Sequence, residues 1–110
     1  MKTNIIYALD WTEYESGWGC RPDGLQVFTS RDAMEKVLER DRKEREAAKS
    51  TPSEYSIPTT KYVMEVDDMD ATALEIVLVD SNWFLEAGKR DIKYLSKLCP
   101  SLKVIATENL

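Results

Sequence analysis

Apolar residues open the chain in strand-like runs. Residues 3–9 are rich in Ile and Tyr, and residues 24–29 form a second such run after the turn signal Pro22-Asp23-Gly24. We therefore predict an N-terminal β-hairpin with a long loop over residues 10–24. A short helical turn inside that loop stays open as an alternative, because aromatic residues also recur there at spacings of four, three and four: Tyr7, Trp11, Tyr14 and Trp18.

A helical pattern follows the second run. Ser30 or Thr29 is suited to cap a helix, and Asp32 sits in its first turn. Residues 39–46 are all charged, with acids and bases spaced for i,i+4 pairs, each of which stabilises an exposed helix by about 0.2–0.5 kcal/mol. We predict a helix that reaches Ala48 with a solvated outer surface. Its apolar stripe comprises Ala33, Met34, Val37 and Leu38.

The second half of the chain is less regular. Residues 50–58 contain two prolines and indicate a linker, and residues 60–66 predict a third strand. The apolar run 74–79, a helical stretch and the apolar run 102–106 then predict a right-handed βαβ unit with parallel strands. A helix over residues 71–79 remains the alternative. The predicted helical stretch carries Phe84, Ile92, Leu95 and Cys99.

Together these patterns predict an α/β (α+β) fold in one domain, residues 1–110. The expected architecture is a small single-layer mixed sheet with an N-terminal β-hairpin, two main helices on one face and a C-terminal βαβ-like unit. A chain of this length buries enough surface to fold without metal or disulfide staples. Its 43% apolar and 32% charged residues are ordinary for a packed domain. Trp83, Phe84 and Leu85 are expected to anchor the core.

Composition narrows the function classes. The net charge of −5 disfavours a nucleic-acid partner, and no apolar run approaches the length that spans a membrane. With no export signal expected at the N-terminus, we expect a cytoplasmic protein whose Cys20 and Cys99 stay reduced. The chain has no histidine, the commonest general base, so we do not expect an enzyme and expect no cofactor.

Two clusters of charged residues are either ligand sites or ordinary solvated surface. Four acids, Asp67, Asp68, Asp70 and Asp80, are weak candidates for a metal site, since carboxylates bind Mg²⁺. They would support the alternative of a metal-dependent hydrolase or nucleotide-binding enzyme, although a solvated turn with an N-cap at Asp70 is favoured. A basic stripe on the last helix is interpreted as its solvated face: Lys89, Arg90, Lys93 and Lys97.

The loop 10–24 is the candidate binding surface. It holds two of the three tryptophans and three of the four glycines, and Trp and Tyr dominate binding hot spots. A protein partner is therefore expected, although a small core folded back on itself explains the same pattern equally well. A homo-oligomer built by pairing an exposed strand edge is a further alternative. The candidate partner-binding residues are Trp11, Glu13, Tyr14, Glu15, Trp18, Arg21 and Asp23.

Residues 1–66 carry a generic resemblance. The segment Glu13-Tyr14-Glu15, the run Val27-Phe28-Thr29-Ser30 leading into a helix, and the strand with Tyr62 resemble small uncharacterised accessory domains of phages and bacteria. This resemblance implies a modulator or inhibitor of a host protein and supplies no catalytic residues. The chain departs from the pattern from Leu74 onward.

Overall fold

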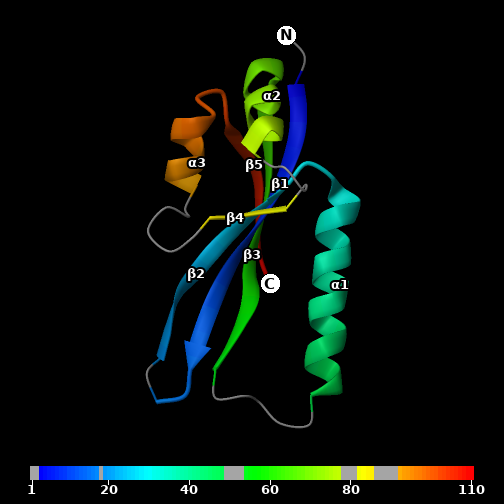
Figure 1. The fold of residues 1–110 in the computed structure, drawn as a ribbon, viewed down its shortest axis with the longest axis vertical. Helices are drawn as coiled ribbons and strands as arrows, with labels where there is room; N and C mark the ends of the chain where they lie inside the picture. Colours follow the sequence, from blue (N-terminus) through cyan, green and yellow to red (C-terminus); the bar gives the residue numbers. More distant parts are fainter. Residues whose placement is uncertain (1–2, 18, 49–53, 78–81, 86–91) are drawn as a thin grey trace.

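The computed structural model describes residues 3–17, 19–48, 54–77, 82–85 and 92–110. Within them the chain forms strands and helices of very unequal length, with the three longest strands at the centre of the molecule (Figure 1). In chain order the elements are β1 (Thr3–Glu15), β2 (Gly19–Phe28), α1 (Arg31–Ala47), β3 (Glu54–Asp67), α2 (Asp68–Val77), β4 (Asn82–Leu85), α3 (Ile92–Leu98) and β5 (Lys103–Asn109).

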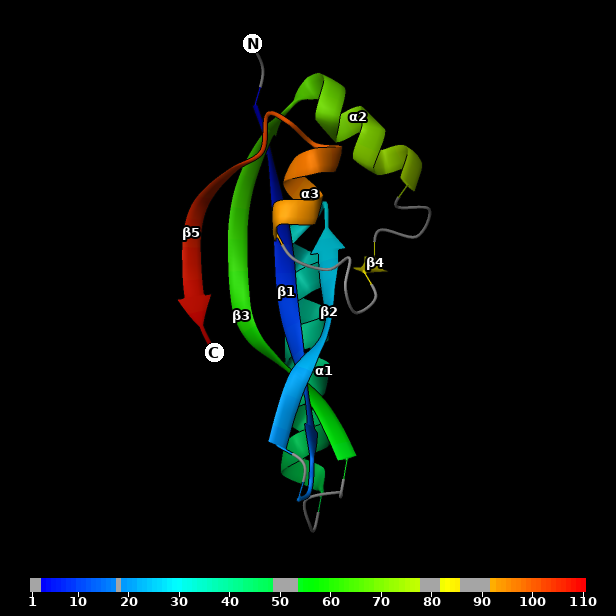
Figure 2. The ribbon, with the colours of Figure 1, turned by 90° about the vertical axis from the view of Figure 1, so that its left-hand side faces the viewer.

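The strands form one sheet in the order β4-β2-β1-β3-β5, and every neighbouring pair is antiparallel. The predicted α+β class and the N-terminal hairpin are therefore confirmed. Figure 2 shows the sheet with β5 at one edge, and β4 pairs with β2 at the other. None of the helices in the described residues is both long and apolar enough to cross a membrane.

Helices cover both faces of this sheet, so the prediction of two main helices on one face is wrong. Even-numbered residues of β1, such as Ile6 and Ala8, pack with Leu74 of α2 and Leu95 of α3. Odd-numbered Leu9 packs instead with residues of α1 on the opposite face. Because successive strand residues point to opposite sides, the unbroken apolar run in β1 needs cover on both.

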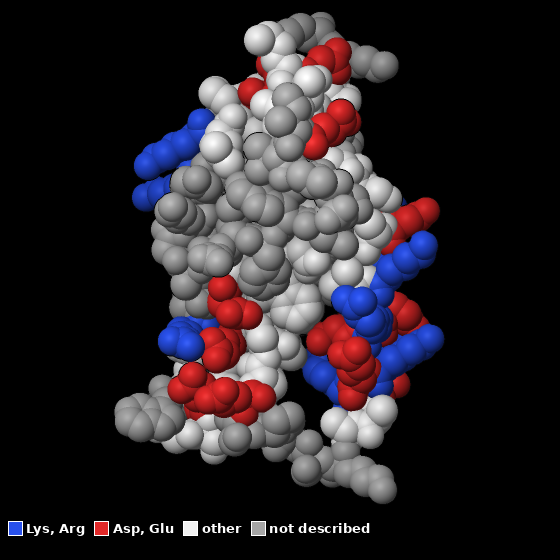
Figure 3. Space-filling model, viewed as in Figure 1, with Lys and Arg blue, Asp and Glu red and all other residues white. Residues whose placement is uncertain are grey.

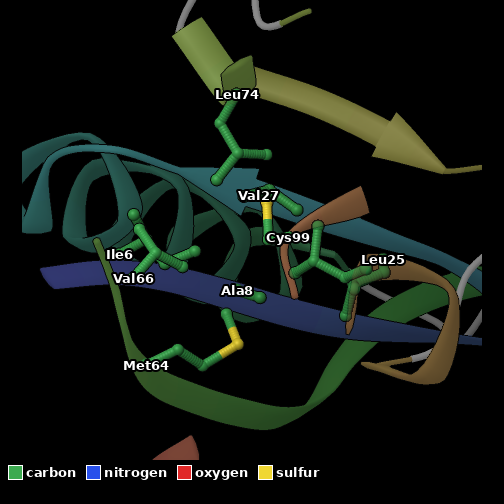
Figure 4. Close-up of a cluster of buried hydrophobic side chains, with 9 residues drawn as sticks. Ile6, Ala8, Leu25, Val27, Met64, Val66, Leu74 and Cys99 are labelled. Atoms are coloured by element: carbon green, nitrogen blue, oxygen red, sulfur yellow. The ribbon is translucent and has the colours of Figure 1, made fainter. Parts of the chain in front are cut away.

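The two covered faces give two hydrophobic clusters. In the larger one, Leu74 points from α2 toward Val27, and Cys99 lies beside them (Figure 4). The smaller cluster lies beneath the first turns of α1. Its buried members are Leu9, Phe28, Met34 and Val37.

Helix α1 follows its sequence pattern closely. The hydroxyl of Ser30 accepts a hydrogen bond from the N–H of Ala33 at 3.4 Å, as an N-cap should. The charged second half carries three of the expected i,i+4 ion pairs, which join Lys43 to Glu39, Arg45 to Asp41 and Arg42 to Glu46. The hydrogen bonds that Arg42 donates to Glu39 and Glu46 raise the pKa of Arg42.

Two predicted irregular segments are strands in the structure. Most of the loop 10–24 belongs to β1 and β2, with described turn residues at Ser16 and Gly17, and no helical turn forms among its described residues. The predicted linker contributes residues 54–58 to β3, where Pro58 is buried opposite Trp11. Sequence reasoning missed both extensions because Glu, Asp, Gly and Pro are depleted in strands.

The C-terminal prediction needs the largest correction. Residues 74–77 belong to helix α2, so the helical alternative is right there, while residues 78–81 lie outside the described residues. Phe84 lies in strand β4 rather than in a helix. A strand-helix-strand order does occur as β4-α3-β5, but the two strands lie at opposite edges of the sheet and pair antiparallel with β2 and β3. The predicted pair of adjacent parallel strands is therefore wrong.

Candidate functional site

One end of the sheet extends as a three-stranded projection, which we call the arm. It comprises residues 12–15 of β1, 19–23 of β2 and 54–57 of β3. Figures 1 and 2 show α2 and α3 over the opposite end of the sheet. Strand β4 pairs only with residues 25–28, and β5 only with residues 60–65. On their outer sides, the two outer strands of the arm thus have no strand neighbour among the described elements.

Bulges separate the arm from the rest of the sheet. The register of β1 skips Asp23 on β2, and it skips Thr59 on β3 at almost the same level. Bulges bend a strand and increase its twist. The Thr59 hydroxyl donates to the carbonyl of Asp10 at 3.2 Å, so the hydroxyl of Thr12 is the donor in their 2.8 Å contact. These bonds link β1 and β3 at the level of the bulges.

The tip of the arm depends on glycine. Gly17 and Gly19 have φ angles of +83° and +87°. Residues with a Cβ atom rarely adopt this left-handed region, whereas glycine adopts it freely. The two glycines therefore allow β1 to reverse into β2. Trp18 lies outside the described residues.

Trp11 anchors the base of the arm. Its ring is half-buried against the smaller cluster beneath α1, and its indole N–H donates to the side-chain oxygen of Gln26 at 3.1 Å. Burial of the ring together with a satisfied N–H is the usual state of a tryptophan in a packed site. Of the two tryptophans in the predicted loop, Trp11 therefore has a packing role in the structure.

Acidic side chains gather on one face of the arm. Arg21 lies between two of them, with its Nε 3.0 Å from Glu13 Oε2 and its Nη2 3.6 Å from Glu15 Oε1. The hydrogen bond that Arg21 donates to Glu13, together with the charge of both acids, raises the pKa of Arg21. Asp23 accepts a bond from the Ser56 hydroxyl at 2.7 Å. In Figure 3 red atoms gather over the arm at the lower left, beside a smaller group of blue atoms.

The opposite face of the arm carries a pair of stacked tyrosines. Tyr14 and Tyr55 are directly opposite each other on β1 and β3, and their ring centroids are 5.2 Å apart with an interplanar angle of 18°. Thr12 and Ile57 form the next cross-strand pair on this face. Neither hydrophobic cluster includes the two tyrosines. The stack is thus an aromatic surface outside the core.

The acidic run 67–70 has structural partners. Asp67 Oδ1 accepts from the N–H of Asp70 at 2.9 Å, so Asp67 rather than Asp70 caps α2. Asp70 Oδ2 accepts bonds from the backbone N–H and the hydroxyl of Ser101, which tie α2 to the turn before β5. Asp68 Oδ1 accepts from Asn4. These bonds explain the acids without a ligand.

Some residues of the predicted metal site and of the predicted basic stripe lie outside the described residues. Asp80, Lys89 and Arg90 belong to the segments that are not described, and Lys93 and Lys97 of α3 are exposed. Among the described residues, no group of three or more acids or cysteines is placed to hold a metal ion. The metal-dependent enzyme stays a prediction that calorimetric titration with Mg²⁺ tests.

The two cysteines are free thiols in very different settings. Cys20 is exposed on the arm, opposite Tyr14, whereas Cys99 is buried in the larger cluster. Burial, together with the nearby charges of Asp70 and Asp67, raises the pKa of Cys99 to about 11. Cys99 is therefore a neutral core residue at ordinary pH.

No family of known proteins, no curated protein and no solved structure matches the chain.

Proposed function

We propose that this protein is a small protein-binding module that recognises its partner through the arm. The observation that carries the proposal is the Tyr14–Tyr55 stack, which lies on the sheet yet outside both hydrophobic clusters. Aromatic rings that combine a large apolar area with a polar group are enriched in binding hot spots. The resemblance of residues 1–66 to accessory domains makes a host protein the partner class that we propose.

The two faces of the arm have complementary roles in this proposal. The stacked tyrosines supply contact area, and their rigid pairing across two strands lowers the entropy lost on binding. The acids of the other face, Glu13, Glu15 and Asp23, supply an acidic rim that steers a basic partner toward the arm. Trp11 supports the arm from its base through the packing described above.

Quantitative capture from a cell lysate tests the proposal. Tagged wild-type protein and a Tyr14→Ala/Tyr55→Ala variant serve as baits, and mass spectrometry measures which proteins each retains. The matched control is Glu35→Ala, an exposed residue on the outer side of α1. Melting temperatures verify that all three baits are folded.

We expect a set of proteins retained by the wild type and the control but lost by the tyrosine variant. A second variant, Glu13→Lys/Glu15→Lys, should reduce capture, and the loss should be smaller at high salt, where exposed charges are screened. Identical retained proteins for the wild type and the tyrosine variant would refute the assignment to the arm.

A further inference from the structure

Strand β5 presents an open edge of the sheet. It pairs with β3 on one side, and no described element lies beyond its other side (Figure 2). Every residue from Lys103 to Asn109 is exposed, including Val104 at 38% and Ile105 at 50%. An edge strand of this kind offers unpaired backbone N–H and C=O groups to another strand.

The direction of these backbone groups follows from the register with β3. The N–H of Leu110 donates to the carbonyl of Thr59 at 3.0 Å and so points toward β3. Since alternate residues of a strand point the same way, Ala106 also directs its backbone toward β3, and Thr107 directs its backbone outward. Val104 also directs its backbone N–H and C=O groups outward, as Thr107 does. The two residues lie opposite Met64 and Tyr62, which are two residues apart on β3.

A bulge in β5 determines which side chains share a face. Between the pairs Val63–Ala106 and Met64–Val104 the register skips Ile105. Lys103 and Glu108 are five residues apart and would point to opposite faces of a regular strand. With the bulge they lie opposite Glu65 and Lys61 respectively, and so on one face. Lys61 Nζ already lies 3.0 Å from Glu108 Oε2.

We infer that β5 pairs with β5 of a second copy of this chain, antiparallel, about a two-fold axis at Ala106. In this register Val104 lies opposite Thr107 of the second copy, and their outward backbone groups form the hydrogen bonds. Ala106 lies opposite Ala106 of the second copy, and this pair forms no backbone hydrogen bonds between the two β5 strands. The strands approach most closely at such a pair, so a small side chain fits there. The result is one continuous sheet, closed by the symmetry of the pair.

Charge complementarity favours this occupant over a different protein. Lys103 lies opposite Glu108 of the second copy. A row of four side chains then crosses the joined sheet, one on each strand, and their charges alternate in sign. It begins with Glu65 of β3 and Lys103 of β5 and continues with Glu108 and Lys61 of the second copy. The two-fold symmetry produces a second, identical row. Opposite charges at facing positions stabilise strand pairs. Helix α1 packs on β1 and β2, so it leaves this part of the sheet clear.

Disulfide trapping tests the register. In a Cys20→Ser background, Ala106→Cys places two thiols on facing residues whose Cα atoms are about 4.5 Å apart, within the range that a disulfide spans. The matched control Thr107→Cys is one residue away and is also exposed. Its two copies would lie more than about 8 Å apart, too far for a bridge. We expect mild oxidation to cross-link the first variant and not the second, and equal cross-linking of both would overturn the register.

Charge exchange tests the partner. Sedimentation should give the wild type twice the chain mass of 12.6 kDa, and Lys103→Glu or Glu108→Lys alone should weaken self-association about tenfold. A dimer of either single variant contains two pairs of like charge between positions 103 and 108. A mixed dimer of the two variants contains two pairs of opposite charge at the same positions. The mixture should therefore associate more tightly than either variant alone. A wild type that stays at 12.6 kDa at millimolar concentration, or a mixture no tighter than its components, would overturn the inference.

Discussion

The buried thiol of Cys99 makes the stability of this protein depend on alkaline pH. Its side chain is 1% exposed within the larger cluster. Burial and the charges of Asp70 and Asp67 raise its pKa from 9.0 to about 11. A pKa raised in the folded state means that the stability is complete below about pH 9 and is lost as the pH rises toward 11, because the unfolded thiol ionises first.

The magnitude follows from the two pKa values. At pH 10 the unfolded thiol is mostly ionised and the folded thiol is mostly neutral, which corresponds to a loss of about 1.4 kcal/mol in the free energy of unfolding. Cys99→Ala removes the ionisable group. The difference in unfolding free energy between wild type and variant should therefore shrink by about 1.4 kcal/mol between pH 7 and pH 10.

Urea denaturation followed by circular dichroism measures this difference. Both proteins are titrated with urea at each pH under reducing conditions, so that Cys20 forms no disulfide in either. Other groups that titrate at high pH, such as Tyr62, whose pKa is raised by burial and by Asp10, are common to both proteins and cancel. A difference that stays constant from pH 7 to pH 10 would refute the burial of Cys99 in the larger cluster.

Two further substitutions test the architecture. Leu9→Ala should lower the free energy of unfolding by about 2–5 kcal/mol, because Leu9 is fully buried on the face of β1 that α1 covers. The control Ile5→Ala lies on the same strand at a residue that is 42% exposed, and it should lower the free energy of unfolding far less in the same urea titration. Asp67→Ala should cost about 0.5–2 kcal/mol through loss of the α2 cap, visible as a lower melting temperature. If Glu75→Ala, an exposed control in α2, lowered the melting temperature as much, the capping role would be wrong.

The local patterns of the first half were sufficient to predict its helix and strands. Ser30 and the stripe that includes Met34 and Val37 specify α1 by rules that act within a few residues. The arm was not predicted, because its strand character depends on pairing between residues about 40 positions apart, such as Tyr14 and Tyr55. Alternation of acidic and aromatic residues in Glu13-Tyr14-Glu15 is the signal that could have revealed it.

The C-terminal half was harder for a different reason. A short apolar run such as residues 74–79 fits a buried strand and a buried helix equally well, and periodicity does not separate them. Asp67, placed three residues before Asp70, is the capping pattern that favours the helix. The edge positions of β4 and β5 follow from long-range packing, which no local pattern encodes.

For the candidate site, the sequence identified the segment but not its geometry. The residues proposed for partner binding divide between two faces of one arm, with Glu13 and Arg21 on one and Tyr14 on the other. Tyr55 was missed because it lay in the predicted linker. Trp11 belongs to the packing at the base of the arm.

Hydrogen exchange of the protein with a partner captured by the wild type is the most direct test of the arm as a binding surface. The outer strands of the arm, residues 19–23 and 54–57, have no strand neighbour among the described elements on their outer sides, so their outward amides should exchange rapidly in the free protein. We expect binding to slow amide exchange in these residues and to leave exchange in residues 39–46 of α1 unchanged. Protection confined to α1 or α3, with the arm exchanging as in the free protein, would contradict it.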